Sequence, residues 1–210
     1  MAPLTGSRKT RKLPYDGVKN GWYATLPEPA PARILEGDIT ADWLVLGGGA
    51  CGLSFARRLA ELRPDDSIAV IEGMRVGYGT SGRNAGFMLS HHSHGGIKNL
   101  DAAKKSDRLF QTGRNYLREI VEHHQIRCNW SDWGQIYVSA SPPGDAHLDD
   151  VANGFETLGI AHTAVDRDEL ESITGTRFYN SGVWVDGSSL VQPAAMMRGL
   201  GETLPPNVTL

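Results

Sequence analysis

The sequence predicts an α/β fold built on a parallel β-sheet, and three features of residues 42–72 support this prediction. Residues 42–46 and 68–71 are short apolar runs with the composition of strands that are buried on both faces. Between them, residues 50–62 carry apolar side chains at helical spacing, and Pro64 ends that helix. A strand, a helix and a strand within about 30 residues form a βαβ unit, which is right-handed by strong default.

The composition is that of a globular protein. The 210 residues correspond to about 1.4 domains at roughly 150 residues per domain, and 40% of them are hydrophobic. The net charge of −3 gives no reason to expect a nucleic-acid partner, and no apolar run approaches the roughly 20 residues that span a bilayer. Two cysteines are too few for a disulfide framework, which favours a reducing compartment. The first residues also lack the apolar core of a secretory signal, so we expect a cytoplasmic protein without a membrane span.

Residues 1–40 have the composition of an arm rather than of a domain. Five prolines in this stretch remove backbone donors and disfavour both helices and central strands. A small basic cluster consists of Arg8, Lys9, Arg11 and Lys12. It could be a phosphate-binding patch or an address signal, but we expect it to be part of a solvated terminus. Trp22 and Tyr23 predict that the later part of the arm packs onto the body of the protein.

The strongest functional signal lies in residues 47–52, which fit the G-x-G-x-x-G fingerprint of dinucleotide-binding, Rossmann-type domains. Gly47 permits a tight turn, Gly49 lets a pyrophosphate approach the backbone, and Gly52 lets the helix pack closely on the sheet. Glu72 follows the second strand, 20 residues after Gly52, where a carboxylate accepts hydrogen bonds from a ribose. The alternative is a glycine-rich turn with a solvated glutamate. The fingerprint alone does not distinguish FAD from NAD(P).

The rest of the chain divides into elements by its periodicity and its prolines. Helical spacing predicts a long amphipathic helix over residues 98–125, whose apolar face includes Leu109, Phe110 and Ile120. The order that we expect is a loop over 73–96, this helix, a strand over 135–140, a turn over 142–144, helices over 145–158 and 167–173, a strand over 183–185 and a helix over 193–204. Residues 207–210 have the composition of a strand that is just beginning, so we expect the polypeptide to continue in a longer parent or to be completed by a separate chain.

A second motif, Ser-Gly-Arg-Asn-Ala-Gly, occupies residues 81–86. In this loop the sequence resembles the FAD-dependent amine and amino-acid oxidoreductases of the D-amino-acid oxidase superfamily, and most of all their glutamylputrescine oxidase-like branch. Further matches are Trp22-Tyr23 near the end of the arm, residues 36–38 before the first strand, and residues 190–193 at the start of a later helix. The likeness covers nearly the whole chain, but only about the first half of a typical member.

This resemblance implies a discontinuous FAD-binding domain of Rossmann type combined with part of an α+β substrate domain. Residues 41–96 would supply the first section of the FAD-binding domain, and residues 97–189 would form part of the substrate domain. Residues 190–210 would begin an incomplete return to the FAD-binding domain. The chain is therefore expected to be truncated relative to a whole family member.

The resemblance also implies roles for the loop after the second strand, which runs beneath the cofactor in such flavoproteins. Ser81, Arg83 and Asn84 would contact the pyrophosphate or the flavin edge, although Arg83 could also be an ordinary surface arginine. Gly82 and Gly86 would allow close approach of the backbone. A few relatives tether the flavin through a histidine, but the corresponding position here is Arg83, so we expect FAD to be held non-covalently.

Two further candidates lie on either side of this loop. Arg75 would lie over the adenine end of the cofactor, again by resemblance. His91, His92 and His94 could ligate a metal, but no Cys, Asp or Glu at ligand spacing accompanies them. We therefore expect these histidines to form a polar loop that lines the cofactor cavity, and we expect no metal site.

The activity implied by the resemblance is oxidation of the C–N bond of an amine or amino acid that is glutamylputrescine-like, sarcosine-like or D-amino-acid-like. Hydride passes from the substrate to the flavin, and the imine product hydrolyses. No residue is assigned as a general base. Two alternatives stay open: a non-catalytic fragment or partial subunit that needs a second chain, and an NAD(P)-dependent dehydrogenase with the same fingerprint.

Overall fold

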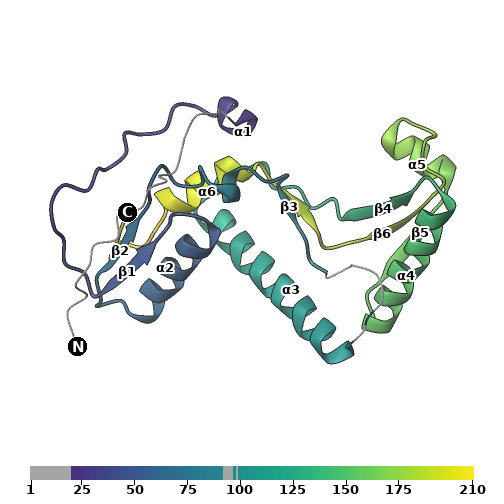
Figure 1. Cartoon of the computed structure of the whole chain (residues 1–210), viewed down its shortest axis with the longest axis horizontal. Coiled ribbons are helices and arrows are strands. Elements are labelled where there is room, and N and C mark those ends of the chain that lie inside the picture. The colour runs from purple at the N-terminus through teal and green to yellow at the C-terminus, as the bar shows by residue number, and fades with distance from the viewer. Residues whose placement is uncertain (1–19, 92–96, 98) are drawn as a thin grey trace, which may run out of the picture.

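The computed structural model describes residues 20–91, 97 and 99–210, which form two three-stranded sheets and a two-stranded ladder (Figure 1). The first sheet is parallel, in the order β1-β2-β8, and consists of β1 (Trp43–Leu46), β2 (Ile68–Ile71) and β8 (Val208–Thr209). Both strands of the predicted βαβ unit are confirmed. The strand predicted to begin near the end of the chain is also confirmed, and it pairs with β2 on the side away from β1.

Helix α2 (Ala50–Leu62) covers this parallel sheet. Its bounds are those expected from the apolar spacing. The side chains of Ala56 and Ala60 are buried against Val45, Ile68 and Val70 of the strands, so small residues on the helix allow close packing on the sheet. This packing fixes the start of α2 directly above the ends of β1 and β2.

A second core forms where α6 (Pro193–Glu202) packs between α2 and the C-terminal half of α3 (Leu100–His123). Both helices were predicted, but the predicted apolar face of α3 is only half right. Ile120 is buried, whereas Leu109 and Phe110 are 63% and 37% exposed. Figure 1 shows the reason: the N-terminal half of α3 extends away from α6, so Leu109 and Phe110 do not join the core around α6.

The second sheet is antiparallel, in the order β4-β6-β5. It consists of β4 (Gln135–Ser139), β5 (His162–Val165) and β6 (Ser181–Val185), packed with α4 (Pro142–Leu158) and α5 (Arg167–Thr174). The turn predicted over 142–144 is wrong, because Pro142 and Pro143 occupy the first turn of α4, where proline needs no helical donor. Strand β5 was not predicted.

Short elements lie between the parallel sheet and the antiparallel sheet. β3 (Phe87–Met88) and β7 (Ser189–Leu190) form an antiparallel ladder, and η1 (Thr80–Gly82) is a 3₁₀ turn. The stretch predicted as a loop without regular structure therefore contains η1 and β3. The arm contains one helical turn, α1 (Gly21–Ala24), which packs on α6 as Trp22 and Tyr23 predicted. None of the helices in the described part of the chain is both long and apolar enough to cross a bilayer.

Candidate functional site

The glycine turn between β1 and α2 has the geometry that the fingerprint predicts. Gly47 has φ +103°, a backbone conformation that side chains other than hydrogen disfavour. A Cβ atom on Gly52 would clash with the carbonyl oxygen of Gly47, so the helix can approach the strand only with glycine at this position. The turn therefore directs the N-terminus of α2, with its free backbone N–H groups, toward the edge of the sheet.

Glu72 lies at the same edge, directly after β2. Its Oε2 atom accepts a hydrogen bond from the Gly48 backbone N–H at 2.7 Å, and its Oε1 atom accepts one from the Met74 N–H at 2.9 Å. One bond ties Glu72 to the glycine turn, and the other lies within the segment that follows β2. Each carboxylate oxygen still has acceptor capacity, so a ligand hydroxyl can be bound in addition.

The loop over residues 81–86 lies against the N-terminus of α2. Ser81 Oγ accepts a hydrogen bond from the Ala50 N–H at 3.0 Å, which is one of the N–H groups that the helix leaves unpaired. Asn84 closes the loop on itself, because its side chain donates to the Ser81 carbonyl at 2.7 Å and accepts from the Gly86 N–H at 2.8 Å. Arg83 Nε donates to the Tyr78 carbonyl at 2.6 Å. The structure thus brings Ser81 to the glycine turn and uses Asn84 to shape the loop.

The two glycines of this loop are needed by the protein itself. A Cβ atom on Gly82 would clash with the Gly77 carbonyl oxygen, and one on Gly86, which has φ +82°, would clash with the Val191 carbonyl oxygen. The close backbone approach expected at both positions is therefore an approach between segments of this chain. The Gly86 carbonyl also accepts a hydrogen bond from the Val191 N–H at 2.9 Å, which ties the loop to the segment entering α6.

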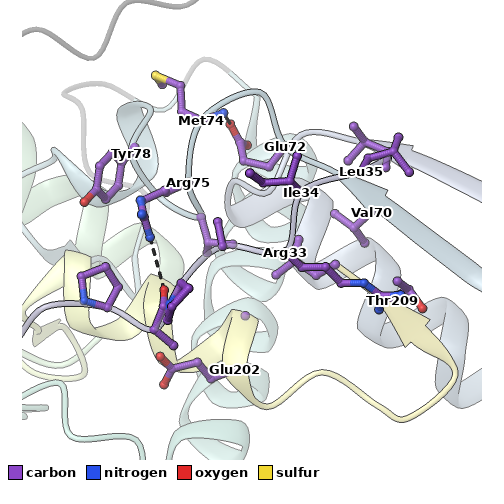
Figure 2. Close-up of a pocket in the computed structure, with 18 of the residues that line it drawn as sticks. Arg33, Ile34, Leu35, Val70, Glu72, Met74, Arg75, Tyr78, Glu202 and Thr209 are labelled. Carbon is purple, nitrogen blue, oxygen red and sulfur yellow. Dashed lines mark hydrogen bonds between the residues drawn. The ribbon is translucent and has the colours of Figure 1, made fainter. Parts of the chain in front are cut away.

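A cavity of about 640 Å³ lies beside Glu72, and this volume is within the range of small-molecule sites. Figure 2 shows that Glu72, Arg75 and Tyr78 border it on one side and the arm residues Arg33 and Ile34 on another. Arg75 extends across it, and its Nη1 atom donates to the carbonyl of Ala30 in the arm at 3.3 Å (Figure 2). The arm is thus part of the wall of this cavity.

This role of the arm could not be predicted from the sequence. Its prolines and its aromatic pair indicated an extended segment that packs on the body, but neither feature says on which surface. The basic cluster at residues 8–12 lies outside the described residues. The arm residues that border the cavity are Pro29, Ala30, Pro31, Ala32, Arg33, Ile34, Leu35, Glu36 and Ile39.

The histidine cluster is only partly described, because His92 and His94 lie outside the described residues. His91 Nδ1 lies 2.7 Å from Asp107 Oδ1, and the two side chains are each 14% exposed. They border a separate cavity of about 400 Å³ at the junction of α3, α4 and β6. Within residues 20–91, 97 and 99–210, no group of three or more His, Cys, Asp or Glu side chains is placed to hold a metal ion.

Comparison with a solved structure confirms the fold class. The structure of L-amino acid deaminase from Proteus myxofaciens in complex with anthranilate matches 81% of this chain with a TM-score of 0.64, at 18% sequence identity. The match covers 38% of that protein. At this identity the likeness concerns the fold alone.

Curated relatives are more similar in sequence. Gamma-glutamylputrescine oxidoreductase of Escherichia coli is 32% identical over 143 residues, which is 66% of this chain and 33% of the relative. The probable oxidoreductase OrdL of Rhizobium meliloti is 30% identical over 193 residues, which is 86% of this chain and 44% of the relative. The chain therefore spans less than half the length of these relatives.

The family itself is identified by a match over residues 42–205, which include both strands of the βαβ unit, the glycine turn and the loop over 81–86. The matching family is described as FAD dependent oxidoreductase, so the predicted cofactor, FAD, and the predicted resemblance are both confirmed. Because this match covers most of its length, the chain belongs to the FAD dependent oxidoreductase family.

Proposed function

We propose that this chain forms the FAD-binding part of an oxidoreductase that oxidises the C–N bond of an amine or amino acid. The observation that carries the proposal is the meeting of the glycine turn, Glu72 and Ser81 at the N-terminus of α2. The substrate class is supported by the Escherichia coli relative, which is named for gamma-glutamylputrescine. The similarity of this chain to that relative favours a nitrogen-bearing substrate.

The residues at this site fit the two phosphates and the adenosine of FAD. The pyrophosphate would lie at the N-terminus of α2, where the helix dipole and the free N–H groups favour an anion. An ideal Cβ atom on Gly49 would lie 3.1 Å from Ser81 Oγ, so a side chain there would fill the space between turn and loop. Glu72 would accept hydrogen bonds from the ribose, and Arg75 would border the adenine. We assign the pyrophosphate or flavin-edge contacts to Ser81, Arg83 and Asn84.

The chain's own part in the reaction is to bind and orient. When bound, FAD would accept the two electrons that leave the substrate as its C–N single bond is oxidised to an imine. The turn at Gly47–Gly52 and the loop over 81–86 would fix the cofactor at one end, and the ladder between β3 and β7 would connect this end to the antiparallel sheet. No described side chain is assigned as a general base.

The proposal is tested by cofactor content and substrate oxidation. Cofactor released from the purified full-length parent should run with FAD in chromatography, and release without added protease would agree with non-covalent binding. Bound FAD should then be bleached under anaerobic conditions by a glutamylated amine, an N-methyl amino acid or a D-amino acid. Recovery of NAD(P) without flavin would refute the cofactor assignment, and bleaching by hydroxy acids but by no amine would refute the substrate class.

A second candidate is a partial subunit that acts only with another polypeptide. The exposure of Leu44 and Leu46 on β1, 63% and 77%, favours it, because a parallel sheet is normally covered on both faces. In this case the partner is either the remainder of a longer chain or a complementary chain. Amine oxidation by the isolated 210-residue chain would exclude this candidate.

A further inference from the structure

The α1 segment, Asn20–Ala24, contacts the loop over residues 81–86 through two side-chain donors. Asn20 Nδ2 donates to the Gly82 carbonyl at 3.0 Å, and Trp22 Nε1 donates to the Asn84 carbonyl at 2.9 Å. Both acceptors are backbone carbonyls of the loop. Its path at these two residues is therefore fixed by a segment about 60 residues earlier in the chain.

Tyr23 adds contacts to the segment that precedes the loop. Its hydroxyl donates to the Val76 carbonyl at 3.3 Å, and its ring centroid lies 4.4 Å from that of Tyr78. The hydroxyl also fills the space beside Gly82, where a Cβ atom would clash with it. The loop at Gly82 is therefore complementary in shape to the Tyr23 side chain of the α1 segment.

The α1 segment is itself anchored to α6. Gln192 Nε2, at the N-cap of α6, donates to the Trp22 carbonyl at 2.8 Å. Arg198 Nη1, in α6, donates at 2.7 Å to the carbonyl of Pro27, just beyond the segment. Asn20 also caps α1 by accepting from the Trp22 N–H at 2.8 Å. Because α6 belongs to the core that it forms with α2 and α3, these bonds connect the loop to a buried part of the protein.

We propose that the α1 segment is a positioning element of the FAD site, which holds the loop over 81–86 against the N-terminus of α2. This inference rests on the proposed function. Its physical basis is that Ser81 meets the Ala50 N–H only while the loop keeps its path, and that path depends on the carbonyls of Gly82 and Asn84. Asn20 and Trp22 are positioning residues, which act on the cofactor through the loop.

The first test is Trp22→Phe in the full chain, which keeps an aromatic ring and removes the indole N–H. The matched control is Trp43→Phe, because Trp43 Nε1 also donates one hydrogen bond, to Asp66 at 2.7 Å, at the opposite end of β1. Loss of one bond should raise the Kd for FAD about threefold to tenfold in Trp22→Phe. Trp43→Phe should bind FAD as the wild type does, and both variants should unfold at similar urea concentrations.

A second variant, together with proteolysis in the absence of FAD, tests the path of the loop without relying on cofactor binding. Asn20→Ser keeps a capping oxygen for α1 and removes the amide that donates to Gly82. Without FAD, trypsin should cleave after Arg83 faster in both loop variants than in the wild type. Cleavage after Arg177, in the segment between α5 and β6, serves as the internal reference and should not change.

The outcomes separate this inference from the proposed function. Faster cleavage after Arg83 together with weaker FAD binding in both loop variants would support the positioning role. Wild-type cleavage and wild-type Kd in Trp22→Phe and Asn20→Ser would overturn it while leaving the FAD site intact. A wild-type chain that takes up no FAD would instead overturn the proposed function.

Discussion

Glu72 accepts a hydrogen bond from the Gly48 backbone N–H at 2.7 Å, so the acid at the end of β2 is bonded to the glycine turn at the end of β1. The parallel register makes this possible, because Leu46 and Ile71 are paired and the residues that follow leave the sheet side by side. The carboxylate therefore stabilises the turn before it meets any ligand. A change at Glu72 should affect both the turn and the ribose contact.

Glu72→Gln should weaken FAD binding. A glutamine presents only one acceptor oxygen, so one of the two backbone N–H groups bound by Glu72 would face an amide donor. Because the charge-assisted bonds to the ribose are also lost, we expect the binding free energy of FAD to weaken by about 1.5–3 kcal/mol, which raises Kd roughly 10- to 150-fold. Flavin fluorescence titration measures the change. Glu202→Gln alters another acid that borders the same cavity and is the control; a shift below about twofold in Glu72→Gln would place the ribose elsewhere.

Gly49→Val should abolish cofactor binding while the protein stays folded. The backbone at Gly49 is extended, with φ −84° and ψ −177°, which valine adopts readily. Its branched side chain would enter the space beside Ser81 Oγ, where the pyrophosphate is expected. We expect FAD affinity to fall at least about tenfold. Gly113→Val on α3, where a Cβ atom would meet nothing within 4 Å, is the matched control, and unchanged flavin content in Gly49→Val would contradict the placement.

Arg57→Met should destabilise the protein. The Arg57 side chain is buried, and its Nη2 atom donates to the carbonyls of Thr203 at 2.6 Å and Leu200 at 3.2 Å, at the C-terminus of α6. Methionine fills the space but leaves these acceptors unpaired, which costs about 1–3 kcal/mol. Urea denaturation measures the difference. The neighbouring Arg58 is mostly exposed and pairs with Glu61, so Arg58→Met should change stability by about 0.5 kcal/mol or less.

Asp132 gives the protein a predicted pH dependence of stability. Its carboxylate accepts hydrogen bonds from Ser189 and Trp130 and forms ion pairs with Arg114 and Arg118. Burial alone would raise the pKa of Asp132, but these bonds and charges outweigh it and lower the pKa. The stabilisation is therefore present at neutral pH, and it is lost as the pH falls below about 4 through the lowered pKa.

Asp132→Asn should reduce stability at neutral pH by about 1–2 kcal/mol, a modest figure because solvent screens this partly exposed group. The gap between variant and wild type should narrow below about pH 4, where the wild-type carboxylate takes up a proton. Urea denaturation at several pH values measures this gap in the free energy of unfolding. Asp168→Asn, which alters an exposed partner of Arg177, is the control and should change the stability at neutral pH by about 0.5 kcal/mol or less. A stability gap for Asp132→Asn that stays constant with pH would refute the assignment.

The βαβ unit and its glycine turn could be predicted because their signals are local. The apolar runs of β1 and β2 end at glycine and at glutamate, and the helical spacing of α2 begins at once after the turn. Close approach at Gly52 also follows from the fingerprint. Such features depend on neighbouring residues and on a geometry that few sequences satisfy.

The features that were missed depend on contacts between distant segments. β5 is a short, weakly alternating run that is a strand only through its pairing with β6. β3 and β7 have two residues each, and Phe87 meets Leu190 only because both segments cross between the sheets. The contact of Trp22 with the Asn84 carbonyl is of the same kind, since donors that reach backbone acceptors leave no periodic trace in the sequence.

The open side of β1 carries the last prediction. Within the described residues β1 has a neighbour only in β2, and its side chains Leu44 and Leu46 are 63% and 77% exposed. An edge strand whose outward face also exposes apolar side chains is a template for association.

We therefore expect the 210-residue chain to self-associate and to retain little FAD after gel filtration. Replacing Leu44 and Leu46 together by lysine should shift the sedimentation profile toward monomer, because charge opposes pairing at the edge. Leu109→Lys, which changes an equally exposed leucine on α3, should leave the profile as in the wild type. A wild-type chain that sediments as a monomer, holds one FAD and oxidises an amine unaided would show that this face needs no covering polypeptide.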